Sequence, residues 1–484
     1  MNLLKTTLSG IMISVAALAN GAALSVSSTA GDLRAQVGDK AAEVTDLVVT
    51  GAVDAADLQF VNHQMPALRS LDLSGAVIAS YSGERLMSGR SSSEAGVVPD
   101  YAFIDSRMTS IVLPASVKEI GEGAFAASDI TAINIPPGVT AIGNAAFADC
   151  RALEQIMLPD GLLELGKGAY RNCTAATRAE LGSSLSEIPE RAFAGCSSLS
   201  TVFFPLNLQE IGPLAFYGID VTNLTVNKCT SLKSIGDWAF ADCRRLANVY
   251  LPSSDFKLGK GAFFSDEAFT ADLTSLVKNS DSIPAYAFAG NASMTVTKFE
   301  DTRITKIGDY ALRGLGSVDT VTLPASLDSI GTRAMEGWSA LTSVDARNLG
   351  EKVPELGDDV WLGVAQGDVA LVVTTPQSLL FSATPQWMDF AMKIIDPSAL
   401  DDVAADASGH GVKGSIAGDL LTLESQGAEI LGFQLYDLQG RMIALPQTSP
   451  AQTVTASVEA VGSSVVVVRV LLSDSSVAVL KLAR

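Results

Sequence analysis

Ile142-Gly-Asn-Ala-Ala-Phe-Ala-Asp-Cys150 is the stretch that decides the fold, because variants of it return about every 23 residues through most of the chain. Close variants run from Ile188 to Cys196 and from Ile235 to Cys243. A second phrase, L-x-x-I-x-L-P, stands before many of them, as in Leu153 to Pro159. A fixed period of about 20–30 residues with two apolar phrases per unit is typical of a solenoid of stacked coils.

Each phrase has a physical role in the predicted coil. Ile156 and Leu158 alternate as a strand requires, and Pro159 ends that strand because it offers no N–H to a ladder. Gly143 is expected to permit a backbone angle that a side chain would resist. The aromatic residue of each unit should fill the middle of its coil and stack on the ring of the coil before. These aromatic places are Phe103, Phe125, Phe147, Tyr170, Phe193, Phe216, Phe240, Phe263 and Phe288, followed by Leu312, Met335 and Trp361.

The fold predicted from this pattern is mainly β: a solenoid of about 12 coils, each of about 23 residues in short strands and loops. Units that end in I-G-x-x-A-F-x-x-C after L-x-x-I-x-L-P resemble the BspA-like leucine-rich repeat family of bacterial surface proteins. The resemblance covers about Leu68 to Ile395. It implies a leucine-rich repeat solenoid and adhesion to host extracellular-matrix proteins or to other microbes.

The N-terminal stretch, residues 1–30, reads as a signal peptide. Lys5 supplies the positive region, residues 8–18 the apolar core, and Ala19 or Ala30 the residue before the cut. The apolar run is shorter than the roughly 20 residues that a membrane span needs. The chain is therefore expected to be exported to the outer cell surface or the extracellular space, with no membrane span.

The predicted solenoid, residues 100–396, has distinct ends. Residues 31–99 are expected to cap its start, with strands at Val44–Val49 and Leu68–Leu73 and a helix from Asp54 to Met65. An irregular coil is expected at Phe269–Ser280, because Asp272 falls where an apolar residue belongs. A short helix from Pro385 to Met392 is expected to close the stack.

Beyond a polar linker, residues 397–414, the 23-residue period is absent. Residues 415–484 predict a small C-terminal β-sandwich. Its expected strands are Leu420–Leu423, Ile430–Tyr436, Met442–Leu445, Thr453–Val458, Val465–Leu472 and Val477–Leu482. Residues 433–441, 465–470 and 481–484 resemble the C-terminal sorting domain of the type IX secretion pathway, from which residues 462–465 depart because they lack the usual Gly followed by Tyr.

The net charge argues against two classes of partner, and the cysteines could be either free thiols or disulfides. The net charge of −20 argues against nucleic acid and anionic lipid, which need a basic surface. Four of the five cysteines, Cys150, Cys173, Cys196 and Cys243, share one place in the repeat, and Cys229 lies outside it. Parallel side chains on neighbouring coils keep Cβ atoms about 4.8 Å apart, beyond the usual span of a disulfide of about 3.8 Å. Buried free thiols are therefore favoured over disulfides.

No motif in the sequence predicts catalysis, a metal or a cofactor. The chain has only two histidines, His63 in the cap and His410 in the linker. A pair of carboxylates could serve a glycosidase, but no spacing singles one out. We therefore predict a protein that is not an enzyme and that needs no cofactor.

A binding surface is predicted on the outward side of the strands. The residue between the last two apolar places of each strand must face solvent, which gives Val112, Asn134, Met157, Glu180, Phe203, Thr225, Tyr250, Lys298, Thr322 and Asp345. Met157, Phe203 and Tyr250 are too apolar for a plain solvated face and form the predicted ligand-binding site. The alternative is that they are ordinary scattered surface residues.

Three functions fit this sequence. The first is a secreted or cell-surface repeat protein that binds extracellular proteins without catalysis, in adhesion to host matrix proteins or other cells. The second is a surface glycan-binding protein in nutrient capture, with Phe203 and Tyr250 as stacking platforms. The third is a structural surface protein without a ligand.

Overall fold

The structure is a computed structural model that describes residues 22–86, 88–266, 268–395, 411–417, 420–436, 442–444, 449–457, 465–473 and 477–483. Its residues divide into two compact units, Met1–Val369 and Ala370–Arg484, which are taken separately below. The apolar core of the predicted signal peptide and most of the predicted linker lie outside the described residues.

The first unit begins with a parallel sheet of long strands, β1 (Ala22–Ser28), β2 (Val44–Val53) and β3 (Ser70–Ile78). The helices α1 (Leu33–Val37) and α2 (Ala55–Gln64) connect them, together with the 3₁₀ turn η1 (Gly38–Ala42). The strands and the helix predicted for the cap are confirmed. Strand β1 was not predicted, since it lies inside the stretch assigned to the signal peptide.

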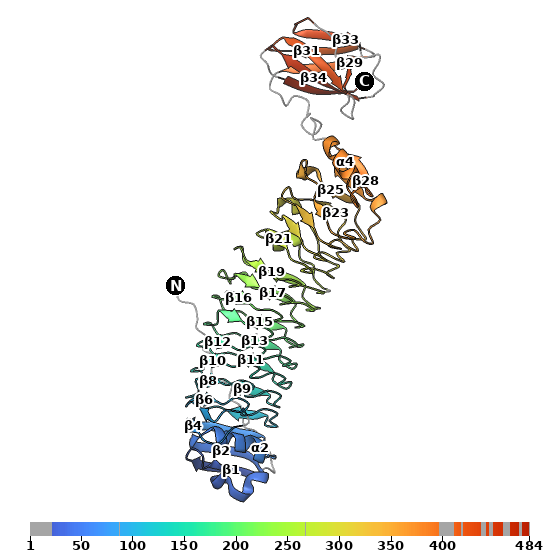
Figure 1. Ribbon diagram of the computed structural model, residues 1–484. Coiled ribbons are helices and arrows are strands. Elements are labelled where there is room, and N and C mark those ends of the chain that lie inside the picture. Colours follow the sequence, from blue (N-terminus) through green and yellow to red (C-terminus); the bar gives the residue numbers. More distant parts are fainter. Residues whose placement is uncertain are drawn as a thin grey trace. The chain divides into compact units, whose positions relative to one another are not determined.

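Past the cap, the unit stacks two columns of short parallel strands (Figure 1). The hairpin β4 (Tyr81–Ser82) and β5 (Ser92–Ser93) stands at their start. The first column contains β7 (Ser110–Val112), β9 (Ala132–Asn134), β11 (Gln155–Met157), β13 (Arg178–Glu180), β15 (Thr201–Phe203), β17 (Asn223–Thr225), β19 (Asn248–Tyr250), β23 (Thr320–Thr322) and β25 (Ser343–Asp345). The second contains β6 (Val97–Val98), β8 (Glu119–Ile120), β10 (Ala141–Ile142), β12 (Glu164–Leu165), β14 (Glu187–Ile188), β16 (Glu210–Ile211), β18 (Ser234–Ile235), β20 (Lys257–Leu258), β21 (Ser282–Ile283), β22 (Lys306–Ile307), β24 (Ser329–Ile330) and β26 (Glu355–Leu356).

A third column of backbone hydrogen bonds links the loops between coils. At one junction, the N–H groups of Gly123, Phe125 and Ala127 donate to carbonyls of the next coil over 2.9, 2.7 and 2.7 Å. The same three bonds recur at every junction, ending with the bond from Gly337 N–H to the Leu362 carbonyl, 2.8 Å long. In the described part of the stack, this column of backbone bonds continues through all the coils, whereas both strand columns are interrupted.

The glycine of the repeat has a different role from the one predicted. Gly143 does not have a positive φ, whereas Ala145 and Asp149, which flank the ring of Phe147, have φ values of 52° and 61°. A Cβ atom on Gly143 would lie 2.6 Å from the backbone nitrogen of Glu122 in the preceding coil. Glycine is therefore needed here for the close approach of two backbones.

The predicted aromatic stack is confirmed. From Phe103 to Phe288, rings of successive coils lie 4.9 to 5.8 Å apart, centroid to centroid, and are near parallel. Phe269 adds a further ring, 5.7 Å from Phe263. All of these rings are buried, so the stack forms the apolar core of the coils.

The irregular coil predicted around Phe269–Ser280 is also present. It holds a helix, α3 (Leu273–Val277), where other coils have a strand. Asp272 does not occupy an apolar place: it caps α3 by accepting the N–H of Ser275, and it also accepts the N–H of Thr297 over 2.8 Å. Three further 3₁₀ turns follow later in the chain: η2 (Phe299–Asp301), η3 (Arg347–Leu349) and η4 (Gln366–Asp368).

The second unit begins with strand β27 (Ala370–Val373), helix α4 (Thr375–Ser382) and strand β28 (Ala391–Ile394), which pairs in parallel with β27. The helix predicted at Pro385–Met392 is therefore wrong in position. Trp387 and Phe390 are buried beside Phe381 of α4, and the segment that contains them runs as a turn into β28. The spacing of Trp387 and Phe390, which suggested a helix, is that of a turn whose apolar side chains are buried.

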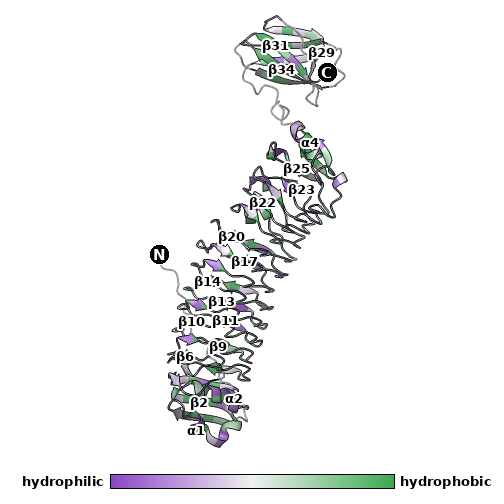
Figure 2. Ribbon diagram, in the orientation of Figure 1, coloured by the Kyte–Doolittle hydropathy of each residue, from purple (hydrophilic) through white to green (hydrophobic). Residues whose placement is uncertain are grey.

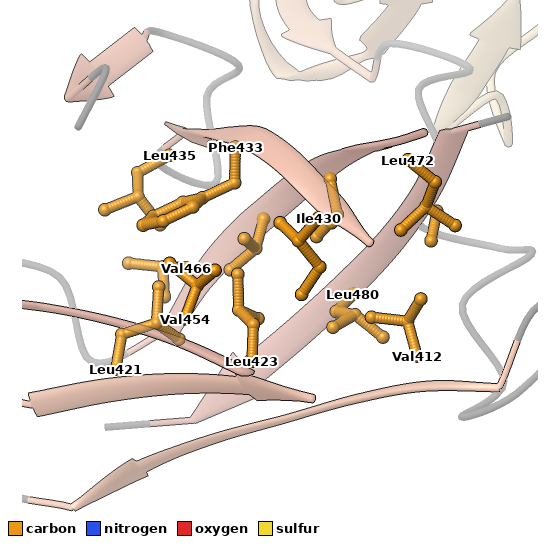
Figure 3. Close-up of a cluster of buried hydrophobic side chains, with 13 residues drawn as sticks. Val412, Leu421, Leu423, Ile430, Phe433, Leu435, Val454, Val466, Leu472 and Leu480 are labelled. Atoms are coloured by element: carbon orange, nitrogen blue, oxygen red, sulfur yellow. The ribbon is translucent and has the colours of Figure 1, made fainter. Parts of the chain in front are cut away.

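The C-terminal residues form two antiparallel sheets (Figure 1). One contains β29 (Val412–Ala417), β30 (Leu420–Ser425) and β33 (Thr453–Ser457); the other contains β31 (Ile430–Tyr436), β32 (Met442–Ala444), β34 (Val465–Leu472) and β35 (Val477–Ala483). All six predicted strands are present, and β29 begins inside the predicted linker. Buried side chains from both sheets, including Leu423 and Phe433, form one apolar cluster (Figure 3). Figure 2 shows mostly hydrophobic residues along these strands.

Candidate functional site

The candidate site is the outward face of the first column of strands. In strands such as β9, β11 and β17, the first and third residues are exposed and the middle one is buried. The middle residue, such as Ile156 or Leu224, packs into the coil, because side chains alternate along a strand. Two rows of side chains, one from the first and one from the third positions, therefore face solvent.

The three residues predicted to bind a ligand all lie in the row of third positions. Met157, Phe203 and Tyr250 are 37%, 48% and 49% exposed. Met157 pairs with Glu180 and Glu180 with Phe203 in one three-stranded sheet, so Phe203 lies two strands, roughly 10 Å, from Met157. Tyr250 pairs with Thr225 in the separate sheet of β17 and β19. The structure thus brings Met157 and Phe203 onto one sheet and leaves Tyr250 on another.

Arg178 is a residue of this face that the sequence prediction missed. Its guanidinium carbon lies 4.5 Å from the centroid of the Phe203 ring, and its side chain also forms an ion pair with Glu180. A cation over a ring adds about 0.5–1 kcal/mol at an exposed site and holds both side chains in place. The sequence prediction used only the third residue of each strand, whereas the first residue faces solvent on the same side.

The later part of the face differs from the prediction at one position. Asn248 donates from its side-chain amide to the amide oxygen of Asn223 over 2.9 Å, which links β17 and β19 outside the ladder. Lys298 was predicted to lie on an outward strand, but it precedes the turn η2 with a φ of 49° and belongs to no strand. The irregular coil removes the strand on which that prediction depended.

The cysteines form a second row, inside the coils. The thiols of Cys150, Cys173, Cys196 and Cys243 donate to the backbone carbonyl of the aromatic residue in the coil before, over 3.0 to 3.4 Å. Cys229 donates to the Pro205 carbonyl in the same way. All five are buried, and burial raises the pKa of the Cys150 thiol to about 11. Their burial and their carbonyl partners are those of core residues.

Asp266 and Asn291 take the cysteine place in the next two coils. The side-chain amide of Asn291 donates to the Phe263 carbonyl over 2.7 Å and its oxygen accepts the N–H of Asp266. Asp266 accepts the N–H of Cys243 at Oδ1, while its buried Oδ2 has no partner among the described residues. Burial raises the pKa of the Asp266 carboxyl well above its usual range, chiefly by desolvating the charged form. The row is structural throughout.

Within the described residues, no cluster of three or more His, Cys, Asp or Glu side chains could hold a metal ion. In the same part of the chain, no helix is both long and apolar enough to cross a membrane.

Comparison with known proteins shows what the stack is similar to. Six copies of the family model described as "BspA type Leucine rich repeat region" match within residues 96–222, 164–281 and 281–360. A solved leucine-rich repeat protein from Bacteroides ovatus is 22% identical, with a TM-score of 0.57, over 77% of this chain and 88% of that one. No curated protein sequence matches the chain.

Two further solved structures are less similar. A leucine rich cell surface protein from Faecalibacterium prausnitzii is 22% identical over 55% of this chain and 85% of that one, with a TM-score of 0.33. The pneumococcal vaccine antigen PcpA is 17% identical over 68% of this chain and 85% of its own, with a TM-score of 0.36. The family model therefore carries the identification.

Proposed function

The chain belongs to the family of BspA-type leucine-rich repeat proteins, and from that premise we propose that it is a secreted or cell-surface protein that binds extracellular proteins without catalysis. The predicted signal peptide supports export, and the family resemblance supports adhesion to host matrix proteins or to other cells. The acidic charge favours a partner that is neither nucleic acid nor anionic lipid.

The observation that carries this proposal is the make-up of the strand face, defined as the outward residues of β11, β13, β15, β17 and β19. It presents Met157, Phe203 and Tyr250, with Arg178 packed over Phe203. Aromatic residues, methionine and arginine are the types enriched where proteins meet. Because Arg178 packs over the Phe203 ring, this pair would lose less conformational freedom on binding than free side chains would.

The test is solid-phase binding of the mature chain to a panel of purified extracellular-matrix proteins. A Phe203→Ala/Tyr250→Ala variant should bind at least ~10-fold more weakly, because removing a central aromatic anchor typically costs about 2 kcal/mol or more. Leu163→Ala is the matched control: Leu163 is 61% exposed but lies directly before β12, outside the strand face.

Each result has a defined meaning, provided that both variants melt like the wild type. Equal loss of binding in the Leu163→Ala control would remove the strand face as the site. Binding only to a glycan array, lost in the double variant, would replace protein adhesion by glycan capture. No binding to any panel would leave a structural surface protein.

A further inference from the structure

The ladders of both strand columns stop at the junction between β20 and β21. Within the described residues, β20 pairs only with β18, and β21 pairs only with β22. In the first column, no strand follows β19 until β23, and a single bridge between Asp272 and Thr295 stands in the interval. The loop-side bonds continue, from Gly261 N–H to the Ala285 carbonyl over 2.9 Å.

A proline explains the missing pairing in the second column. At regular junctions a glycine N–H donates to the coil before, as Gly259 does to the Ile235 carbonyl over 2.7 Å. Pro284 takes that place and has no N–H. Pro189 does the same between β12 and β14, but there β11, β13 and β15 carry the first column across the junction. Among the junctions that the structure describes, the one at Pro284 alone has no ladder in either column.

An open groove of about 540 Å³ lies at this junction. Its apolar lining comes from Phe256, Leu258 and Pro284. Leu258 is half-buried, whereas its equivalents Ile235 and Ile283 in the neighbouring coils are each only 1% exposed. The volume is within the range of about 300–1,000 Å³ that is common for ligand sites.

The two sides of the groove carry backbone groups without partners. The carbonyls of Phe256 and Leu258 correspond to those of Lys233 and Ile235, which accept bonds from the next coil. In the described part of the chain they accept none, and the N–H of Ser282 opposite them donates none. One side therefore offers acceptors and the other a donor, as an unfilled position in a β-ladder would.

Ion pairs fix the rim of the groove. Arg303 reaches Asp281 over 2.8 Å and Asp255 over 3.3 Å, so it connects both sides. The side-chain amide of Asn279 donates to the Ser253 carbonyl over 2.7 Å. Asp255, Asn279, Asp281 and Arg303 thus form a polar part of the lining, and none of these contacts uses the backbone groups of Phe256, Leu258 or Ser282.

We propose that this groove binds an extended peptide segment of a partner protein, which adds a strand against β20. The N–H groups of the peptide would donate to the Phe256 and Leu258 carbonyls, and its apolar side chains would pack on Phe256 and Pro284. An extended backbone alternates donors and acceptors at the spacing of a ladder, which a saccharide does not. The groove is separate from the strand face, so binding at either can fail without the other.

The experiment pans a phage-displayed library of seven-residue peptides on the full mature chain and measures the selected peptides by fluorescence polarisation. Phe256→Ala should weaken binding at least ~10-fold. Pro284→Gly supplies an N–H that competes for the Leu258 carbonyl and should also weaken it. Pro189→Gly, the matched change at the closed junction, and Phe203→Ala on the strand face should leave it unchanged.

A second readout tests the backbone directly. Methylating alternate backbone nitrogens of a selected peptide removes its donors and should lower affinity at least ~10-fold in one of the two registers. If Phe256→Ala lowers the melting temperature, Pro284→Gly and the methylated peptides decide the result. Failure to select any peptide, equal binding by all variants, or displacement of the peptide by soluble oligosaccharides would each overturn the proposal.

Discussion

At the scale of single residues, the place three residues after the ring satisfies a backbone carbonyl of the coil before in six coils. Cysteine fills it by donating from a thiol, Asn291 from an amide and Trp338 from its indole, to the Leu312 carbonyl over 2.8 Å. Asp266 can do so only as the protonated acid, through Oδ2. The place accepts donors of several chemistries, and it also accepts the apolar side chains of Ile219 and Leu315, which are buried there without a donor.

Asp266→Asn should stabilise the protein at neutral pH and flatten its pH dependence. The raised pKa of Asp266 means that its contribution to stability is fully present below the unfolded pKa of about 4 and is lost as pH rises toward the folded value. An asparagine would reproduce the bonds of Asn291 without charge, a gain of about 1–3 kcal/mol. Thermal melts from pH 4 to pH 9 measure both.

The neighbouring polar residue provides the control for this prediction. Asn291→Asp should introduce a second buried carboxyl and steepen the loss of stability with rising pH. Identical melting profiles for the wild type and Asp266→Asn across that range would mean that Asp266 is already satisfied as a carboxylate.

At the scale of elements, the cap indicates which of the two predicted signal cuts preserves the fold. Strand β1 pairs with β2 along its whole length, from Ala22 with Val44 to Ser28 with Gly51. The buried carboxylate of Asp57 accepts the N–H of Gly31 over 2.7 Å and that of Leu33 over 3.0 Å, which ties the end of β1 to α2. A cut after Ala30 would remove β1 and leave β2 at the edge of the sheet.

We therefore expect the exported protein to begin at Asn20. N-terminal sequencing of the secreted chain, or its intact mass, measures this directly. A mature protein that begins at Gly31 would show that the cap folds without β1. It would also predict a less stable protein, since the apolar contacts and hydrogen bonds of a whole edge strand would be missing.

The sequence predicted well the elements that recur in every coil. It predicted poorly the elements that occur once and depend on a single turn. The aromatic stack and the parallel strands follow from a period that many coils share. The closing helix was misplaced because Trp387 and Phe390 suggested helical spacing, while the signal of a helix start lay earlier. Thr374 and Gln377 form the capping box of α4, in which the Thr374 N–H donates to the Gln377 side-chain oxygen over 2.8 Å.

The candidate site was predicted only in part, for a related reason. Alternation along a strand placed Met157, Phe203 and Tyr250 correctly on the surface. Their division between two sheets could not be predicted, because it depends on which junctions keep their pairing. The groove at Pro284 left one readable sign in the sequence, a proline in the glycine place, but its opening also depends on the helix α3 in the same coil.

At the scale of the whole molecule, stability does not depend on disulfides. The five cysteines lie in the core as hydrogen-bonded thiols, although the chain is expected to be exported. Native protein at pH 8 should react slowly with a thiol reagent, because burial raises the pKa of the Cys150 thiol to about 11. In denaturant without reductant, all five thiols should react.

A count of three or fewer thiols in the denatured chain would reveal a disulfide and contradict this expectation. A melting temperature that falls when reductant is added would do the same. The measurement therefore decides between the two states of the cysteines that the sequence left open.

The junction at Pro284 also has a mechanical meaning. A stack of coils bends most easily at the junction that has the fewest bonds across it. Here both strand ladders are interrupted between β20 and β21, while the loop-side bonds, the bond from Thr270 N–H to the Ala247 carbonyl and the ion pairs of Arg303 still cross the junction. Tension along the stack should bend it at this junction before it stretches an intact ladder.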